Sequence, residues 1–190
     1  MSEFEFVQVT FAIILGLGVT SILSSIAEQL NARHTHAVFG LQLFAQSVLL
    51  LLLLIQLWGF WVTQDTEWDI GIFLFHAVSP LCFAIAAHAT RVDVRPGAAS
   101  VRDQYISNAR VVYGFWMVAS VFGVALTFFY ARQLDVTLME TAPLIALRVL
   151  GAAALVVMLL SKNARIHWCC LALLLATLSS VLLAFFFELE

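Results

Sequence analysis

Six apolar runs, separated by short polar connections, limit what this chain can fold into. A helix that crosses the hydrocarbon core of a bilayer needs about 20 mostly apolar residues. We predict six transmembrane helices, at about 6–29, 37–62, 70–89, 109–130, 142–161 and 166–187. The 190 residues therefore indicate a single domain, 1–190, that is all-α and built as a polytopic membrane helix bundle.

The composition supports this prediction. The chain is 63% hydrophobic and 11% charged, with a mean hydropathy of +1.00, whereas soluble domains are about 45–50% apolar and about 25% charged. A soluble fold of this size cannot bury so much apolar surface, so the lipid bilayer is the expected environment. No Lys/Arg-rich face suggests a nucleic-acid partner, and none is predicted.

Basic residues are concentrated in the first, third and fifth connections between the predicted spans. Seven of the nine lie there: Arg33, Arg91, Arg95, Arg102, Arg110, Lys162 and Arg165. Connections rich in Lys and Arg stay on the cytoplasmic side of a membrane. We therefore predict that both termini lie on the non-cytoplasmic side.

The first half of the chain carries a recognisable order of features. "ILGLGVTSILSSIAEQL" is followed by a short basic turn that contains histidine and then by "LIQLWGFWV". After these come an acidic connection that contains tryptophan and a third span that ends near a basic turn. This order resembles small six-span proteins of the bacterial inner membrane that are uncharacterised. The resemblance implies that location, but it carries over no functional residue.

One face of the first span is polar. Thr20, Ser24 and Glu28 follow Gly16 at intervals of four residues, so they lie along one side of a helix. Small and hydroxyl residues favour close packing between membrane helices. The alternative interpretation is a wet path with Glu28 at its cytoplasmic mouth. Both interpretations require protein or water, not lipid, beside this face.

The second span adds Gln42 and Gln46, which lie one turn apart. They lie at the same depth as the polar face of the first span. We expect an interhelical hydrogen-bond seam within this first hairpin, and we also count both residues among the candidates for lining a transport path.

His76 and Arg148 lie at similar depth in the outer halves of two predicted spans. Each lies roughly 9 Å from the outer end of its helix, at 1.5 Å per residue. Pro80 cannot donate a hydrogen bond to the carbonyl of residue 76, so a kink is expected there. Both side chains are candidates for an anion or proton path. The alternatives are a packing histidine, and an arginine that reaches the interface or pairs with Glu140.

The longest connection predicts a helix that starts before the fourth span. Ser100 and Asp103 form a capping box, so the helix should begin near Val101. Its first turns are expected to lie at the lipid headgroups. The more specific alternative is that they bind a particular anionic lipid. The interfacial residues that we predict are Arg102, Tyr105 and Arg110.

Two histidines suggest another possibility. His88 ends the third span and His167 begins the sixth, at comparable depth. Histidines that face each other from two helices can ligate a haem iron or a metal ion. Haem b is the cofactor that this alternative implies, and otherwise no cofactor is predicted.

The chain lacks the GxSxG, HExxH, P-loop and dinucleotide-binding motifs, so we predict no enzyme and no catalytic residue. Three functions remain. The first is a small homo-oligomeric ion channel or channel-like permease for an ion or small solute. The second is a haem-binding electron carrier. The third is a non-catalytic assembly or scaffold subunit of the membrane.

Overall fold

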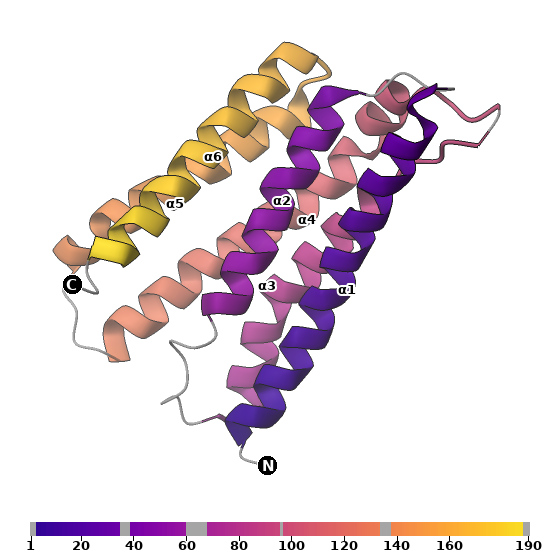
Figure 1. The fold of residues 1–190 in the computed structure, drawn as a ribbon. Coiled ribbons are helices and arrows are strands. Elements are labelled where there is room, and N and C mark those ends of the chain that lie inside the picture. Colours follow the sequence, from indigo (N-terminus) through magenta and orange to yellow (C-terminus); the bar gives the residue numbers. More distant parts are fainter. Residues whose placement is uncertain (1–2, 35–38, 60–67, 96, 134–137, 188–190) are drawn as a thin grey trace.

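A computed structural model describes residues 3–34, 39–59, 68–95, 97–133 and 138–187. These residues form six α-helices and one 3₁₀ turn (Figure 1). The elements are α1 (Glu3–Asn31), η1 (Ala32–His34), α2 (Gly40–Gly59), α3 (Ile70–Ala89), α4 (Val101–Gln133), α5 (Leu138–Leu160) and α6 (Ala164–Phe187). The prediction of an all-α fold is confirmed.

Short side chains set two of the helix starts. The Asp69 carboxylate accepts a hydrogen bond from the Ile72 N–H at 2.8 Å and caps α3. The Ser100 hydroxyl oxygen accepts from the Asp103 N–H at 3.2 Å, so the cap predicted for α4 is confirmed. Because no break follows, α4 runs from Val101 through the whole predicted fourth span as one helix.

Four helices contain stretches long and apolar enough to cross a membrane. The stretches are Phe4–Asn31, Gly40–Gly59, Ile70–Ala89 and Val101–Phe129. In α5 and α6 the apolar stretches within the described part, Ile145–Leu160 and Ala164–Ser180, are shorter. The fold is therefore compatible with an integral membrane protein, and the number of six spans stays a prediction.

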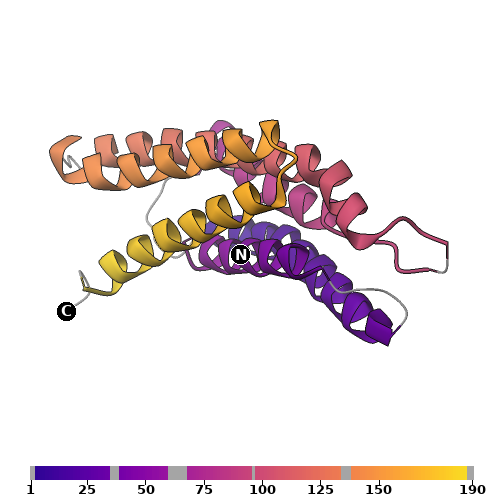
Figure 2. The ribbon, with the colours of Figure 1, turned by 90° about the horizontal axis from the view of Figure 1, so that it is seen from above.

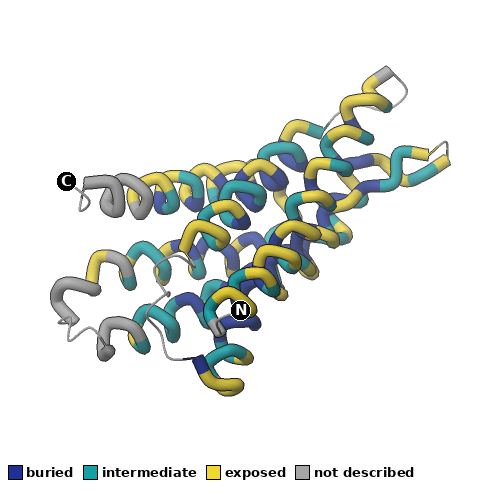
Figure 3. The backbone as a smooth tube through the Cα atoms, turned by 60° about the horizontal axis from the view of Figure 1, so that its bottom comes forward, coloured by how far each residue is buried: buried dark blue, intermediate teal, exposed yellow. Residues whose placement is uncertain are grey.

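Much of the outer surface of the described helices is apolar. Large hydrophobic side chains are exposed on several helices, with Leu17 at 67%, Ile70 at 74% and Leu160 at 84% exposure. Figure 3 shows the same division along each helix, with buried residues turned inward and exposed residues turned outward. A soluble protein rarely exposes contiguous apolar surface on this scale, so the pattern fits a lipid environment.

Five helices form a closed series of contacts. Each helix from α2 to α6 packs against the next, and α6 packs back against α2. In Figure 2, α4 and α5 lie on one side of the bundle and α1 and α2 on the other, with α6 between them. We call α2–α6 the ring.

Helix α1 lies outside the ring, against α2 and α3. Gly18 makes this close packing possible, because a Cβ atom there would lie 3.2 Å from Leu53 and 3.3 Å from the Ala84 backbone. Small residues allow helices to approach in the absence of a hydrophobic driving force between them. The position of α1 decides which predicted residues can reach the centre of the bundle.

The α1–α2, α3–α4 and α5–α6 connections lie together at one end of the molecule, and both termini lie toward the other (Figure 1). The seven basic residues singled out from the sequence lie at or near the end with these connections, which we call the basic end. The helices therefore form three antiparallel hairpins, and the side of the membrane on which their ends lie stays a prediction.

Candidate functional site

A cavity of about 150 Å³, partly open to the outside, lies among the helices of the ring. All five ring helices contribute to its wall, and α1 does not. The polar lining residues are Gln56 of α2, Ser120 of α4, Arg148 of α5 and Thr177 of α6. We call it the Arg148 cavity.

The guanidinium group of Arg148 extends from α5 toward α4. It lies so close to Gly123 that a Cβ atom there would be 2.7 Å from Nη1. The absence of a side chain at Gly123 therefore makes room for the cation. Among the described residues, Arg148 has no ion pair and no hydrogen bond. The side chain of Glu140, its predicted alternative partner, lies outside the described part of the chain.

The other polar groups of the cavity differ in what they offer a ligand. The Ser120 hydroxyl donates to the Trp116 carbonyl at 3.0 Å, and the Thr177 hydroxyl donates to the Leu174 carbonyl at 2.8 Å. Both therefore present lone pairs to the cavity. The Gln56 carboxamide has no hydrogen-bond partner among the described residues. Three lining side chains thus carry donors that have no hydrogen bond among the described residues: Arg148, Gln56 and, through its indole N–H, Trp116.

His76 lies elsewhere in the bundle. Its Nδ1–H donates to the Ile72 carbonyl at 2.8 Å, and its ring packs edge-on against Trp68 and Phe129 at centroid distances of 5.0 and 6.2 Å. Neither His76 nor Pro80, both buried, is among the lining residues of the Arg148 cavity. The two ionisable residues that the sequence grouped by depth are therefore not brought together.

A second polar region lies toward the basic end. We call Ser25, Gln29, Gln42, Gln46 and Thr90, all buried, the amide cluster. The Gln46 Nε2 donates to the Ser25 hydroxyl at 2.9 Å and to the Thr90 carbonyl at 3.1 Å. Gln29 Nε2 donates to Gln46 Oε1 at 3.0 Å. The predicted seam between the first two helices is confirmed, and Thr90 extends it to α3.

The predicted polar face of α1 is divided between two environments. Thr20 is exposed, and its hydroxyl donates to the Gly16 carbonyl of its own helix at 2.8 Å. Ser24 is half-buried. Glu28 pairs with Arg91 at 3.3 Å, with side-chain exposures of 42% and 47%. Because α1 lies outside the ring, none of the three lines the Arg148 cavity.

A chain of three rings joins α4 to α6. The hydroxyl oxygens of Tyr105 and Tyr113 are 2.6 Å apart, and the Tyr105 oxygen lies 2.7 Å from His167 Nδ1. His167 Nε2 lies 3.0 Å from the Ser161 carbonyl, which can only accept. In a neutral imidazole the proton is therefore on Nε2, and we assign Tyr105 as the donor to Nδ1 and Tyr113 as the donor to Tyr105. We call this the tyrosine–histidine chain.

The position of Tyr105 differs from the prediction that it faces lipid headgroups. Its side chain is 5% exposed, because it lies on the α4 face that also carries Ala109 and Tyr113 and packs into the bundle. The eight-residue spacing of the two tyrosines was the available sequence signal. Arg102 and Arg110 are exposed, as expected of interfacial residues, and their contact with lipid stays a prediction.

The two histidines proposed as a haem or metal pair are engaged separately. Both ring nitrogens of His167 are hydrogen-bonded within the tyrosine–histidine chain. His88 is exposed and lies 3.5 Å from the Ser21 hydroxyl of α1. Within the described ranges no group of three His, Cys, Asp or Glu side chains is placed to hold a metal ion. The geometry gives this alternative no support.

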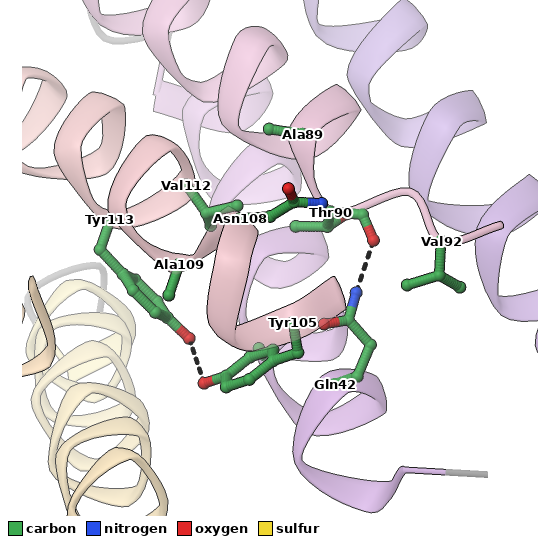
Figure 4. Close-up of a pocket in the computed structure, with 10 residues that line it drawn as sticks. Gln42, Ala89, Thr90, Val92, Tyr105, Asn108, Ala109, Val112 and Tyr113 are labelled. Atoms are coloured by element: carbon green, nitrogen blue, oxygen red, sulfur yellow. Dashed lines mark hydrogen bonds between the residues drawn. The ribbon is translucent and has the colours of Figure 1, made fainter. Parts of the chain in front are cut away.

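The amide cluster and the tyrosine–histidine chain meet at a small cavity. It has a volume of about 10 Å³, and Gln42, Thr90, Asn108 and the two tyrosines are among its lining residues (Figure 4). Polar groups form part of its mostly apolar wall, and the volume suits about one water molecule. The cavity therefore fits structural hydration and leaves the Arg148 cavity as the larger candidate site.

Comparison of the chain with protein-family models, with curated proteins and with solved structures finds no match. The resemblance drawn from the sequence stays a prediction, and the functional argument rests on the geometry of the bundle.

Proposed function

We propose that this chain is an integral membrane protein with six membrane-spanning helices that acts as a channel-like permease for small anions. One observation carries the proposal: a cationic Arg148 faces a cavity inside the ring and has no counter-charge among the described residues. A charge at membrane depth is costly and is retained mainly where it serves a pathway or a ligand. An anion passing through the bundle would supply the missing charge.

The proposed topology has the basic end in the cytoplasm and both termini on the other side. It is supported by the seven basic residues at or near the connections of that end. We further propose a homo-oligomer in the bacterial inner membrane. Thr20 and Gly16 lie exposed on α1, and a second copy would cover them.

Anion flux from proteoliposomes tests the function. Vesicles loaded with potassium chloride or potassium benzenesulfonate are treated with valinomycin, so that anion permeability limits release of the salt. Benzenesulfonate stays ionised and does not cross lipid as a neutral acid. We expect faster release from vesicles with the protein than from empty vesicles, and loss of this increase in Arg148→Met.

Arg110→Met is the matched control, because it removes an exposed arginine of α4 that does not line the cavity. It should conduct as the wild type does. Equal flux in Arg148→Met and wild type, or no flux of either anion above that of empty vesicles, would refute the permease.

A scaffold or assembly subunit is the second candidate. The observation that favours it is the amide cluster, whose buried amides bond to each other and to the backbone and so need no transport role. Under this function every polar residue is structural, flux is absent, and a partner protein copurifies from the native membrane.

A further inference from the structure

The donors in the Arg148 cavity are few: the lining side chains that carry one not committed to a carbonyl are Arg148, Gln56 and, through its indole N–H, Trp116. The hydroxyls of Ser120 and Thr177 are already committed to carbonyls of their own helices. A small inorganic anion loses most of its hydration shell on entering a cavity of this size and needs many donors in return. These three side chains cannot surround such an ion, but an arginine fork matches the two oxygens of one carboxylate.

The remainder of the wall is apolar. Side chains such as Ile55, Phe83, Trp116 and Leu174, together with Gly151, form most of it. A cavity of roughly 150 Å³ with an apolar wall holds one benzene molecule, and the Arg148 cavity has about this volume. The cavity therefore presents a cationic group on one side and an apolar wall over most of the rest.

We propose that the Arg148 cavity binds a small monocarboxylate whose apolar body is about the size of one benzene ring. The carboxylate oxygens accept hydrogen bonds from Arg148, the Gln56 amide adds a donor, and the apolar body contacts the remaining wall. This inference rests on the proposed function, because it names the class of anion that the permease selects.

Equilibrium binding to the full chain in nanodiscs tests the proposal. The probe is radiolabelled benzoate, measured by dialysis against empty nanodiscs. Two competitors separate its parts: sulfate carries charge without the apolar body, and toluene carries the body without the charge. We expect saturable binding at one benzoate per chain, with weaker competition from both compounds than from unlabelled benzoate.

Two substitutions address the two parts of the site. Arg148→Met removes the charge and should weaken benzoate binding roughly 10- to 100-fold, the range for hydrogen bonds to a charged group. Gly151→Leu fills the cavity and keeps Arg148. A Cβ atom at Gly151 would lie 3.4 Å from Leu174, an ordinary contact, so the helix accommodates it. This variant should also lose binding.

Gly114→Leu is the matched control, since it makes the same exchange on a glycine of α4 where a Cβ atom would meet nothing within 4 Å and which does not line the cavity. It should bind benzoate as the wild type does, and helical circular dichroism checks that all variants fold. Unchanged affinity in Arg148→Met, or sulfate competing as well as unlabelled benzoate, would overturn the proposal.

Flux measurements distinguish this inference from the proposed function. Benzoate binding that depends on Arg148, without anion flux, supports the site and removes the permease. Chloride flux that depends on Arg148, without benzoate binding, overturns the inference and leaves the permease standing.

Discussion

The amide cluster and the Arg148 cavity both hold polar groups deep in the same bundle. The groups of the cluster are hydrogen-bonded to each other, whereas Arg148 and Gln56 of the cavity have no described partner. In the cluster, Gln46 uses both ends of its amide in hydrogen bonds to α1 and α3, and Gln29 Oε1 is the one buried acceptor left without a described partner. In the cavity, a cation and an amide have no described partner at all. Polar groups that are hydrogen-bonded to each other hold helices together, whereas polar groups without a partner beside a cavity are available to bind a ligand.

The largest effect that this comparison predicts is on stability in the cluster. Gln46→Leu removes the hydrogen bonds to Ser25, Gln29 and Thr90, and it leaves their buried polar atoms without replacement partners. The free energy of unfolding should fall by about 2 kcal/mol. Denaturation by SDS in mixed micelles, followed by circular dichroism, measures the change.

Ser47→Ala is the neighbouring control. Ser47 is exposed, and its hydroxyl donates to the Leu43 carbonyl of its own helix at 2.9 Å. Its removal should change the free energy of unfolding by less than about 0.5 kcal/mol. Equal stabilities of the two variants would show that the cluster does not hold α1, α2 and α3 together.

The next effect concerns the direction of the tyrosine–histidine chain. Tyr105→Phe leaves His167 Nδ1 and the Tyr113 hydroxyl without their partner, so we expect a loss of about 1.5 kcal/mol. Tyr113→Phe removes only the terminal donor, and Tyr105 still bonds to His167, so the loss should be about 0.5 kcal/mol. Thermal or SDS denaturation of the two variants decides the order, and the reverse order would contradict the central place of Tyr105 in the chain.

A substitution in the Arg148 cavity should change the free energy of unfolding in the opposite direction. Arg148→Met replaces an unpaired cation with an apolar chain of similar length, so the ligand-free protein should gain about 1 kcal/mol in its free energy of unfolding. Benzoate should raise the denaturation midpoint of the wild type and leave that of the variant unchanged. A loss of stability in ligand-free Arg148→Met would mean that the cation already has a partner, and the cavity would then resemble the cluster.

Sequence reasoning predicted the elements that depend on local patterns. The apolar runs fixed where the helices lie, Ser100 with Asp103 marked the start of α4, and Gln42 with Gln46 indicated the seam. The partner of that seam on α3, the Thr90 carbonyl, was not predictable, because a backbone acceptor at a helix end has no residue signature.

Which face of a helix turns inward depends on its neighbours, and one sequence does not contain that information. The four-residue spacing selected Thr20 on α1, whereas the bundle buries Ser25, about 140° further round the helix. His76 and Arg148 were grouped by depth alone, although only Arg148 lies on the cavity. The placement of α1 outside the ring accounts for most of these differences.

The smallest predicted effect on stability tests the placement of α1 outside the ring. Thr20 is exposed and its hydroxyl bonds within α1, so Thr20→Ala should change the free energy of unfolding of one chain by less than about 0.5 kcal/mol. The mass of the particle, measured by light scattering in detergent at several concentrations, gives the second readout. If a second copy covers this face, Thr20→Ala should leave chain stability unchanged and shift the oligomer toward smaller particles. Lost stability at constant mass would mean that Thr20 packs within its own bundle, and α1 would then join the cluster as a helix whose polar residues are all structural.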